Sequence, residues 1–366
     1  MNRFPNKVTN LHADDLHLTQ LGQLCGSNQL FRDRYQVLRV IGRGGFGVTF
    51  LAKNAILPGN PLCVIKQLCP KTTNPKSWER ARVRFEKEAT ILGQLGSHSQ
   101  IPMLVDYFEM NGEFYLVQEY VRGCTIAREV RRHGVRSEAA VKQFLREILP
   151  VLQYVHNHRV IHRDIKPHNI LRCEEDGRLV LIDFGAVKEQ LVQAFEGDGQ
   201  KTASTNFVGT MGFAPPEQFA LRPVYGSDIY ALGVTCLYLL TGKAPLDFEY
   251  EASTGEIAWQ NGVDVSEHFA LVLNKMIKMS LKDRFKSTQD VMWALGMESY
   301  LPGLSSCLAT TKLKGENSSS SEGDNKEHHS PFVRTADQIR ALRAKLNAKK
   351  AQRKYNSSLL HSGSLG

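Results

Sequence analysis

Three glycines in the stretch "IGRGGFGVTF" could hold a phosphate. Gly42, Gly44 and Gly47 form a G-x-G-x-x-G pattern, and a residue without Cβ lets its backbone N–H approach phosphate oxygens closely. The pattern occurs in two unrelated phosphate-binding devices, one that opens a helix and one that joins two strands. A glycine-rich hairpin without any ligand has the same sequence, so the neighbouring residues must decide.

The residues after Gly47 favour the device that joins two strands. Val48, Thr49 and Phe50 are two β-branched residues and one aromatic residue, which favour a strand over a helix. A dinucleotide-binding turn would also need an acidic residue about 20 positions further on, and none occurs between Gly47 and Glu79. A valine after the third glycine, and a lysine in "CVIK" on the next strand, instead favour the flap that covers ATP in protein kinases.

Five further motifs follow in a fixed order: "IHRDIKPHNI", "IDFG", "GTMGFAPPEQ", "GSDIYALG" and "KDRF". Each is a modest signal, but chance does not produce all of them in this order and spacing. Over residues 35–297 the chain resembles the eukaryotic-type (Hanks-type) Ser/Thr protein kinases, and "CVIKQL" and "LGVTCLYLLTG" are most similar to the cyanobacterial branch. The resemblance implies transfer of the γ-phosphoryl group of ATP to Ser or Thr hydroxyls of proteins, in bacterial signalling.

The same resemblance implies an ATP site at the glycine flap, the next strand and the segment after the last strand of the small lobe. Lys66 would bind the α- and β-phosphates, Phe46 would cap the γ-phosphate end, and Val48 would pack on the adenine. The expected members of the site are Ile41, Gly42, Arg43, Gly44, Gly45, Phe46, Gly47, Val48, Val64, Lys66, Glu88, Glu119, Val121 and Leu171.

Two carboxylates compete to be the partner of Lys66. Glu88 lies on an apolar helical stripe, whereas Glu86 lies about 200° away from it at 100° per residue. A carboxylate on a buried stripe needs a cation, so Glu88 is the predicted partner; the alternative is that both carboxylates are solvated. The residues of the stripe are Phe85, Ala89, Leu92 and Leu95.

The resemblance also assigns the chemistry. Asp164 would be the catalytic base and Lys166 would neutralise the γ-phosphate, while Thr210 would line the acceptor pocket. Asn169 and Asp183 would hold Mg²⁺, with Mn²⁺ as the alternative, because their oxygens suit a hard cation.

Regulation and architecture are implied in the same way. Arg163 precedes the base, which in this family marks control by phosphorylation of the activation segment, so Thr202, Ser204 and Thr205 are candidate autophosphorylation sites. A phosphate there would pair with the arginine. The expected structural residues are Glu217 with its partner Arg284, and Asp228.

One strand-rich region and one helix-rich region must position these groups. The predicted fold is a bilobal α+β fold of the protein-kinase type, with a small antiparallel sheet and one main helix in the N-lobe and a mainly helical C-lobe. Residues 1–34 are expected to form an extension whose degenerate cysteine motif keeps only Cys25. The catalytic domain should span 35–300 (N-lobe 35–120, C-lobe 121–300), followed by a disordered linker, 301–334, and a basic helical tail, 335–366.

Charge and cysteine usage limit the location and the partners. The net charge is +9, but residues 301–366 carry +6 of it, so we predict no specific nucleic-acid partner for the body. The tail segment 335–354 is either a solvated basic helix or binds an acidic partner or an anionic membrane surface. Seven scattered cysteines without a C-x-x-C favour a reducing compartment. The longest apolar run, 229–240, is shorter than the roughly 20 residues of a membrane span, so a cytoplasmic protein is predicted.

Two other classes of protein are less consistent with the sequence. A pseudokinase scaffold usually lacks the strand lysine, the base or the DFG aspartate, and all three are present as Lys66, Asp164 and Asp183. Small-molecule phosphotransferases of related fold generally lack the "APPEQ"-like and "SDIYALG" segments, which are also present. A Ser/Thr protein kinase is therefore the preferred prediction.

Overall fold

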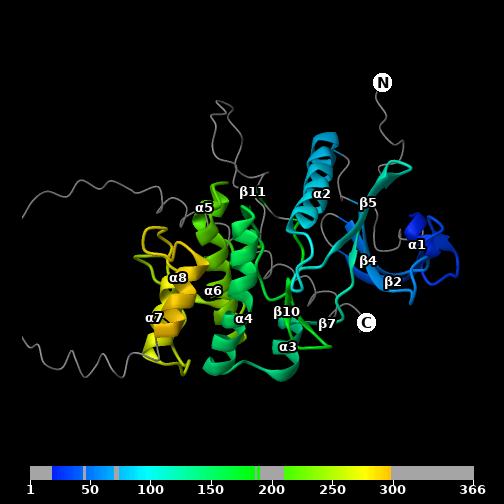
Figure 1. Cartoon of the computed structure of the whole chain (residues 1–366). Coiled ribbons are helices and arrows are strands. Elements are labelled where there is room, and N and C mark those ends of the chain that lie inside the picture. Colours follow the sequence, from blue (N-terminus) through cyan, green and yellow to red (C-terminus); the bar gives the residue numbers. More distant parts are fainter. Residues whose placement is uncertain (1–18, 44–46, 70–73, 186–187, 190–209, 298–366) are drawn as a thin grey trace, which may run out of the picture. The chain divides into compact units, whose positions relative to one another are not determined.

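The computed structural model describes residues 19–43, 47–69, 74–185, 188–189 and 210–297 (Figure 1). The chain divides into two units, and the first, 1–249 and 256–298, holds all the elements that build the site. Several predictions concern residues outside the described ranges: those for Gly44, Gly45 and Phe46, for Thr202, Ser204 and Thr205, for the linker 301–334 and for the tail 335–366.

The N-lobe is built on one antiparallel sheet of six strands in the order β1-β2-β3-β4-β6-β5. β-Branched and aromatic residues make the strands, and the four strands that the sequence indicates at "YQVLRVIG", "GVTFLAKN", "CVIKQL" and "EFYLVQEYV" are present as β2, β3, β4 and β6. The structure adds β1 and β5, which the sequence patterns did not predict. The bounds are β1 Leu30–Phe31, β2 Tyr35–Arg43, β3 Gly47–Asn54, β4 Leu62–Leu68, β5 Leu104–Met110 and β6 Glu113–Glu119.

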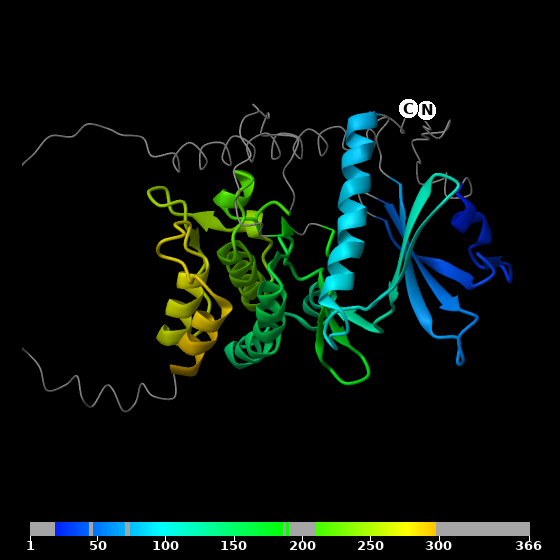
Figure 2. The same cartoon turned by 45° about the horizontal axis from the view of Figure 1, so that its top comes forward.

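Helix α2 (Pro75–Leu95) covers the face of the sheet opposite to the one covered by α1 (Gln20–Leu24) (Figures 1 and 2). It begins earlier than the apolar stripe indicates, because the Asn74 side chain accepts hydrogen bonds from two backbone N–H groups of the first turn. It ends where Gly96 adopts a positive φ of 62°. The buried stripe predicted from the sequence is present and includes Glu88.

The N-terminal segment from residue 19 onward is part of the N-lobe, so the predicted boundary at residue 35 cuts through the sheet. β1 pairs with β2, and Leu21 and Phe31 are fully buried in the core cluster on the outer face. The Phe31 ring lies 4.9 Å from the ring of Tyr115. The segment 1–34 is mostly polar, and its weak apolar pattern did not predict this packing, which Leu21 and Phe31 carry together with the partly buried Leu24 and Cys25.

Replacing Phe31 with alanine should lower the free energy of unfolding by about 3–5 kcal/mol, the usual cost of deleting a buried ring. The matched control is Leu30→Ala in the same strand, because Leu30 points to the other face and is 39% exposed; it should cost about 1 kcal/mol or less. Urea unfolding followed by intrinsic fluorescence measures both. Equal losses for the two variants would show that the segment does not stabilise the lobe.

The C-lobe is mainly helical, as predicted, and forms with the N-lobe a bilobal fold of the protein-kinase type. Its central helix, α6, is buried along almost its whole length. Within the described ranges, no helix combines the length and the apolar character needed to cross a membrane. The helices are α3 Ile126–His133, α4 Glu138–Asn157, α5 Pro216–Phe219, α6 Tyr225–Thr241, the 3-10 helix η2 Pro245–Asp247, α7 Glu267–Met276 and α8 Thr288–Gly296.

Short strands frame the loops that carry the predicted catalytic residues. β9 and β10 form a hairpin whose turn contains the Asp176–Gly177 turn signal of the sequence, and β7 extends it to three strands. The loop between β8 and β9 contains Asp164, and the segment after β10 contains Asp183. The bounds are β7 Gly123–Thr125, β8 Val160–Ile161, β9 Ile170–Cys173, β10 Leu179–Leu181, β11 Lys188–Glu189, β12 Glu249–Tyr250 and β13 Ile257–Ala258.

Candidate active site

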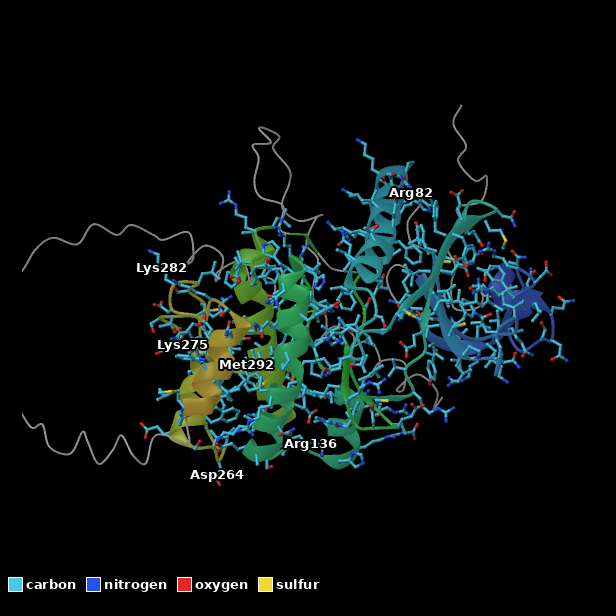
Figure 3. All side chains as sticks on the ribbon, viewed as in Figure 1. Arg82, Arg136, Asp264, Lys275, Lys282 and Met292 are labelled. Atoms are coloured by element: carbon cyan, nitrogen blue, oxygen red, sulfur yellow. The ribbon has the colours of Figure 1, made fainter. Side chains whose placement is uncertain are left out.

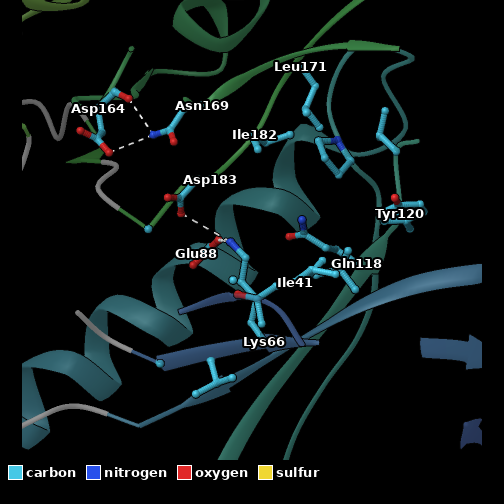
Figure 4. Close-up of a pocket in the computed structure, with 18 of the residues that line it drawn as sticks. Ile41, Lys66, Glu88, Gln118, Tyr120, Asp164, Asn169, Leu171, Ile182 and Asp183 are labelled. Carbon is cyan, nitrogen blue, oxygen red and sulfur yellow. Dashed lines mark hydrogen bonds and ion pairs between the residues drawn. The ribbon is translucent and has the colours of Figure 1, made fainter. Parts of the chain in front are cut away.

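A cavity of about 730 Å³ brings most of the predicted residues together (Figure 4). This volume suits a small-molecule ligand. Of the predicted catalytic, ATP-binding, metal-binding and acceptor-pocket residues within the described ranges, only Arg43 does not line the cavity. Those that do are Ile41, Gly42, Gly47, Val48, Val64, Lys66, Glu88, Glu119, Val121, Asp164, Lys166, Asn169, Leu171, Asp183 and Thr210.

Lys66 joins two carboxylates from different parts of the chain. Its Nζ atom lies 2.5 Å from Oε1 of Glu88 on α2 and 3.4 Å from Oδ1 of Asp183 after β10 (Figure 4). Burial alone would lower the pKa of Lys66, but the two carboxylates outweigh it and raise this pKa above its ordinary value. The charge of Lys66 in turn lowers the pKa of Asp183. The site therefore holds a charged lysine beside an ionised aspartate.

The two carboxylates that competed for Lys66 are separated as the helical stripe predicts. Glu88 is 4% exposed and accepts from Lys66, whereas Glu86 lies 3.4 Å from Arg82 on the exposed side of α2. Gly185 allows this close packing, because a Cβ there would lie only 3.1 Å from Oε2 of Glu88.

Asp164 lies at the centre of a second hydrogen-bonded cluster. Its Oδ1 accepts from the Thr210 hydroxyl at 2.7 Å, and its Oδ2 accepts from Lys166 Nζ at 2.7 Å and from Asn169 Nδ2 at 2.9 Å. Lys166 Nζ also donates to Thr210 at 2.7 Å. Three donors therefore hold this carboxylate in one orientation.

The loop that carries Asp164 is held in a strained conformation by α6. Asp228, which is fully buried, accepts from the backbone N–H of His162 at 2.9 Å and of Arg163 at 2.8 Å. Burial alone would raise the pKa of Asp228, but the hydrogen bond with His156, the charges of His156 and His162 and the backbone N–H of Arg163 outweigh burial and lower this pKa. Arg163 and Asp183 both have a φ of 68°, in the left-handed region, and such strain persists where the surroundings fix it.

Val48 does not take the position expected from the sequence. It reaches the cavity but also packs against the outer core cluster, and it lies opposite Gln67 on β4, whereas Thr49 lies opposite Lys66. Residues opposite each other in an antiparallel pair share a face, so Thr49 is the residue on the face of Lys66. The sequence pattern predicted the strand correctly, but the side chain of this strand that shares the face of Lys66 belongs to Thr49 and not to Val48.

Several lining residues lie outside the predicted site, and three of them show what signal could have found them. Tyr120 lies between the predicted residues Glu119 and Val121, and Ile182 directly precedes Asp183, so position alone could have found them. The third is Arg128 on α3, for which the sequence carries no signal, because only the docking of α3 brings it to the cavity.

Positive charges of α3 lie near the loop that carries Asp164. His168, in the same loop, has a pKa lowered first by burial and then by the charges of Lys166 and Arg131. Arg131 belongs to α3, so the charges of this helix and of the loop act on the same imidazole.

The predicted structural pair, Glu217 and Arg284, forms an ion pair in the C-lobe. Arg284 Nη1 is 2.6 Å from Oε1 of Glu217, and the arginine side chain is fully buried. It also donates to the backbone carbonyls of Lys278, Met279 and Gly226. The pair therefore joins α5, the start of α6 and the segment before α8.

Comparison with known proteins identifies the class. Residues 35–293 match the family described as "Protein kinase domain", so the chain belongs to the protein kinase family. It is 50% identical over 302 residues (82% of this chain, 53% of the relative) to Serine/threonine-protein kinase B of Synechocystis sp.. It is 46% identical over 278 residues (75% and 49%) to Serine/threonine-protein kinase PknA of Nostoc sp.. The chain thus spans about half the length of these curated relatives, and its cyanobacterial resemblance is confirmed.

Proposed function

We propose that this chain is an ATP-dependent Ser/Thr protein kinase. The observation that carries the proposal is the cavity that joins the Lys66–Glu88–Asp183 cluster to the Asp164–Lys166–Thr210 cluster. One cluster offers cationic and carboxylate groups to a polyphosphate, and the other offers a fixed base to a hydroxyl. The names of the relatives support Ser and Thr as acceptors.

The proposed reaction moves one proton and one phosphoryl group. The acceptor hydroxyl gives its proton to Asp164 while its oxygen forms a bond to the γ-phosphorus, and the bond from that phosphorus to the bridging oxygen breaks to release ADP. Lys166 and Lys66 would neutralise charge on the transferred and remaining phosphates. Little covalent work is needed from the protein, so positioning and charge dominate.

The donor set fits a divalent metal. Asn169 uses its Nδ2 to donate to Asp164, which leaves its amide oxygen as an acceptor beside the carboxylate of Asp183. Oxygen ligands of this kind suit Mg²⁺, with Mn²⁺ as the alternative. When bound, the metal would neutralise phosphate charge.

The proposed ATP site changes at one position and gains one residue. Thr49, rather than Val48, would face the nucleotide, because it shares the face of Lys66. Gln118, 6% exposed, lines the same cavity next to Glu119. The roles of Ile41, Val64, Val121 and Leu171 as apolar walls stay part of the proposal.

Regulation by phosphorylation also stays a proposal. The Nε atom of Arg163 is buried and has no hydrogen-bond partner among the described residues, so its N–H could donate to an anionic group such as a phosphorylated Thr202, Ser204 or Thr205.

The deciding experiment is incubation of the full chain with Mg²⁺ and γ-labelled ATP, alone and with a generic protein substrate. We expect label on serine and threonine, identified by phosphoamino-acid analysis, and mass spectrometry of the same sample locates the autophosphorylated residues. Absence of label from both the chain and the substrate, for a folded sample, would contradict the proposed activity.

Replacing Glu88 with glutamine should reduce kcat/KM about 10- to 100-fold, which is the worth of a charge-assisted hydrogen bond to Lys66. Glu86→Gln is the matched control, because it makes the same chemical change on the same helix but removes only an exposed contact with Arg82. It should change kcat/KM by less than about twofold. Glu88 acts through Lys66, so the KM for ATP should rise in its variant; an equal effect of both variants would refute the pairing.

A further inference from the structure

Helix α3 presents a row of cations to solvent. The buried side of the helix consists of Ile126, Ala127 and Val130. The exposed side carries the guanidinium groups of Arg128, Arg131 and Arg132. Spacings of three and four residues place such side chains on neighbouring positions of one face.

This face is fixed beside the loop that carries Asp164. The backbone N–H of Ala127 donates to the carbonyl of Pro167 at 2.9 Å, and the Tyr238 hydroxyl on α6 donates to the carbonyl of Ala127 at 3.5 Å. The Thr125 side chain caps the helix by accepting from the N–H of Arg128. The first turn of α3 is thereby held to the catalytic loop and to the core helix of the C-lobe.

Two of the arginines lie close to the proposed transfer site. Arg128 lines the same cavity as Asp164, Lys166 and Thr210. Arg131 lies on the same side of α3, and its Nε donates to the carbonyl of Ala127 at 3.4 Å, the residue whose N–H is bonded to Pro167 of the loop. A solvated basic helix far from the cavity would show neither feature.

The acidic residue of α3 does not compensate these cations. Glu129 is engaged by Arg136 at 3.2 Å and by Arg172 at 3.0 Å. Its charge is therefore offset by two other arginines, and the face beside the loop keeps a net positive charge.

We propose that the acceptor peptide of this kinase carries aspartate or glutamate residues next to the phosphorylated serine or threonine, and that Arg128 and Arg131 bind these carboxylates. The inference rests on the proposed kinase function and names its substrate class. The guanidinium fork suits a carboxylate, whereas a lysine- or arginine-rich peptide would be repelled from the same surface.

The test compares three acceptor peptides that share one central serine and differ only in the flanking positions: aspartate, asparagine or lysine. An exposed ion pair contributes about two- to fivefold in binding, so two pairs should give the aspartate peptide a kcat/KM about tenfold above the asparagine peptide. The lysine peptide should be the poorest. The preference should shrink at about 0.5 M NaCl, because salt screens exposed charges.

Charge reversal assigns the preference to α3. The Arg128→Glu/Arg131→Glu variant should prefer the lysine peptide, and Arg128→Gln/Arg131→Gln should remove the preference without reversing it. Ratios between peptides are compared, so a general loss of activity cancels. The control is Lys282→Glu, which reverses the charge of an exposed lysine elsewhere on the lobe. Lys282 lies on the α7–α8 side, away from Arg136 near the end of α3 (Figure 3). This variant should keep the wild-type ratios.

The outcomes separate this inference from the proposed function. A wild-type chain that labels all three peptides equally, or prefers the lysine peptide, is a kinase but refutes the acidic substrate class. A preference for aspartate that survives both double substitutions refutes the assignment to α3. No transfer to any peptide and no self-labelling would overturn the kinase function itself, and this inference with it.

Discussion

Replacing Asp164 with asparagine should lower the rate of phosphoryl transfer by about 10²- to 10⁴-fold, the usual worth of a positioned general base. The substitution keeps the size of the side chain but removes the negative charge that accepts the hydroxyl proton. It also places an amide where Oδ1 and Oδ2 now accept from Thr210, Lys166 and Asn169. Proton transfer and orientation are therefore both lost.

The loss should lie in kcat rather than in ATP binding. Lys66 and its two carboxylates do not contact Asp164 in the described hydrogen bonds, so the KM for ATP should change by no more than about threefold. The matched control is Asp176→Asn in the exposed β9–β10 turn, where Asp176 pairs with Arg178; its kcat should equal that of the wild type. A kcat for Asp164→Asn within about tenfold of wild type would contradict the role of Asp164 as the base.

Replacing Arg284 with methionine should lower the free energy of unfolding by about 3–5 kcal/mol, the cost of removing one partner of a buried ion pair. The variant leaves the carboxylate of Glu217 without its cation and three backbone carbonyls without their donor. Within the described part of the chain, the Ser227 hydroxyl would still donate to Glu217 Oε1 at 2.8 Å. Thermal and urea unfolding of the full chain measure the loss.

Two further variants show whether the cost comes from the buried charge. Arg222→Met changes an exposed arginine three residues before Tyr225 and should alter stability by no more than about 0.5 kcal/mol. Arg284→Met/Glu217→Leu removes both charges, so it should be more stable than Arg284→Met alone, because an apolar pair can replace a buried ion pair. A double variant that is less stable than either single variant would show that the loss arises from packing instead.

The family and most of the proposed chemistry could be predicted from the sequence, because they depend on short motifs. "HRDIKPHN" places Asp164, Lys166 and Asn169 within six residues of one loop, and such a loop has few ways to arrange them. The choice of Glu88 over Glu86 was also local, since helical periodicity alone separates the two side chains by more than half a turn. The strands beside the glycines followed from β-branched residues in the same way.

The tertiary structure decided what depends on contacts between distant segments. The packing of residues 19–34 on the sheet rests on a few apolar side chains, chiefly Leu21 and Phe31, which are too far apart in the sequence to give a periodic signal. Thr49 and not Val48 shares the face of Lys66 because of the register between β3 and β4. A shift of one residue turns a side chain to the other face of the sheet. Arg128 reaches the cavity only because Ala127 and Pro167 join α3 to the loop across forty residues of sequence.

By itself, then, the sequence determined the class of protein, the bilobal fold and the residues proposed to carry the reaction, since each is encoded in a local pattern. The structure alone decided which faces those residues share and which cations of α3 lie at the cavity. The physical reason is that motifs fix the chemistry of short segments, whereas the register of strands and the docking of helices set the charge and shape between them.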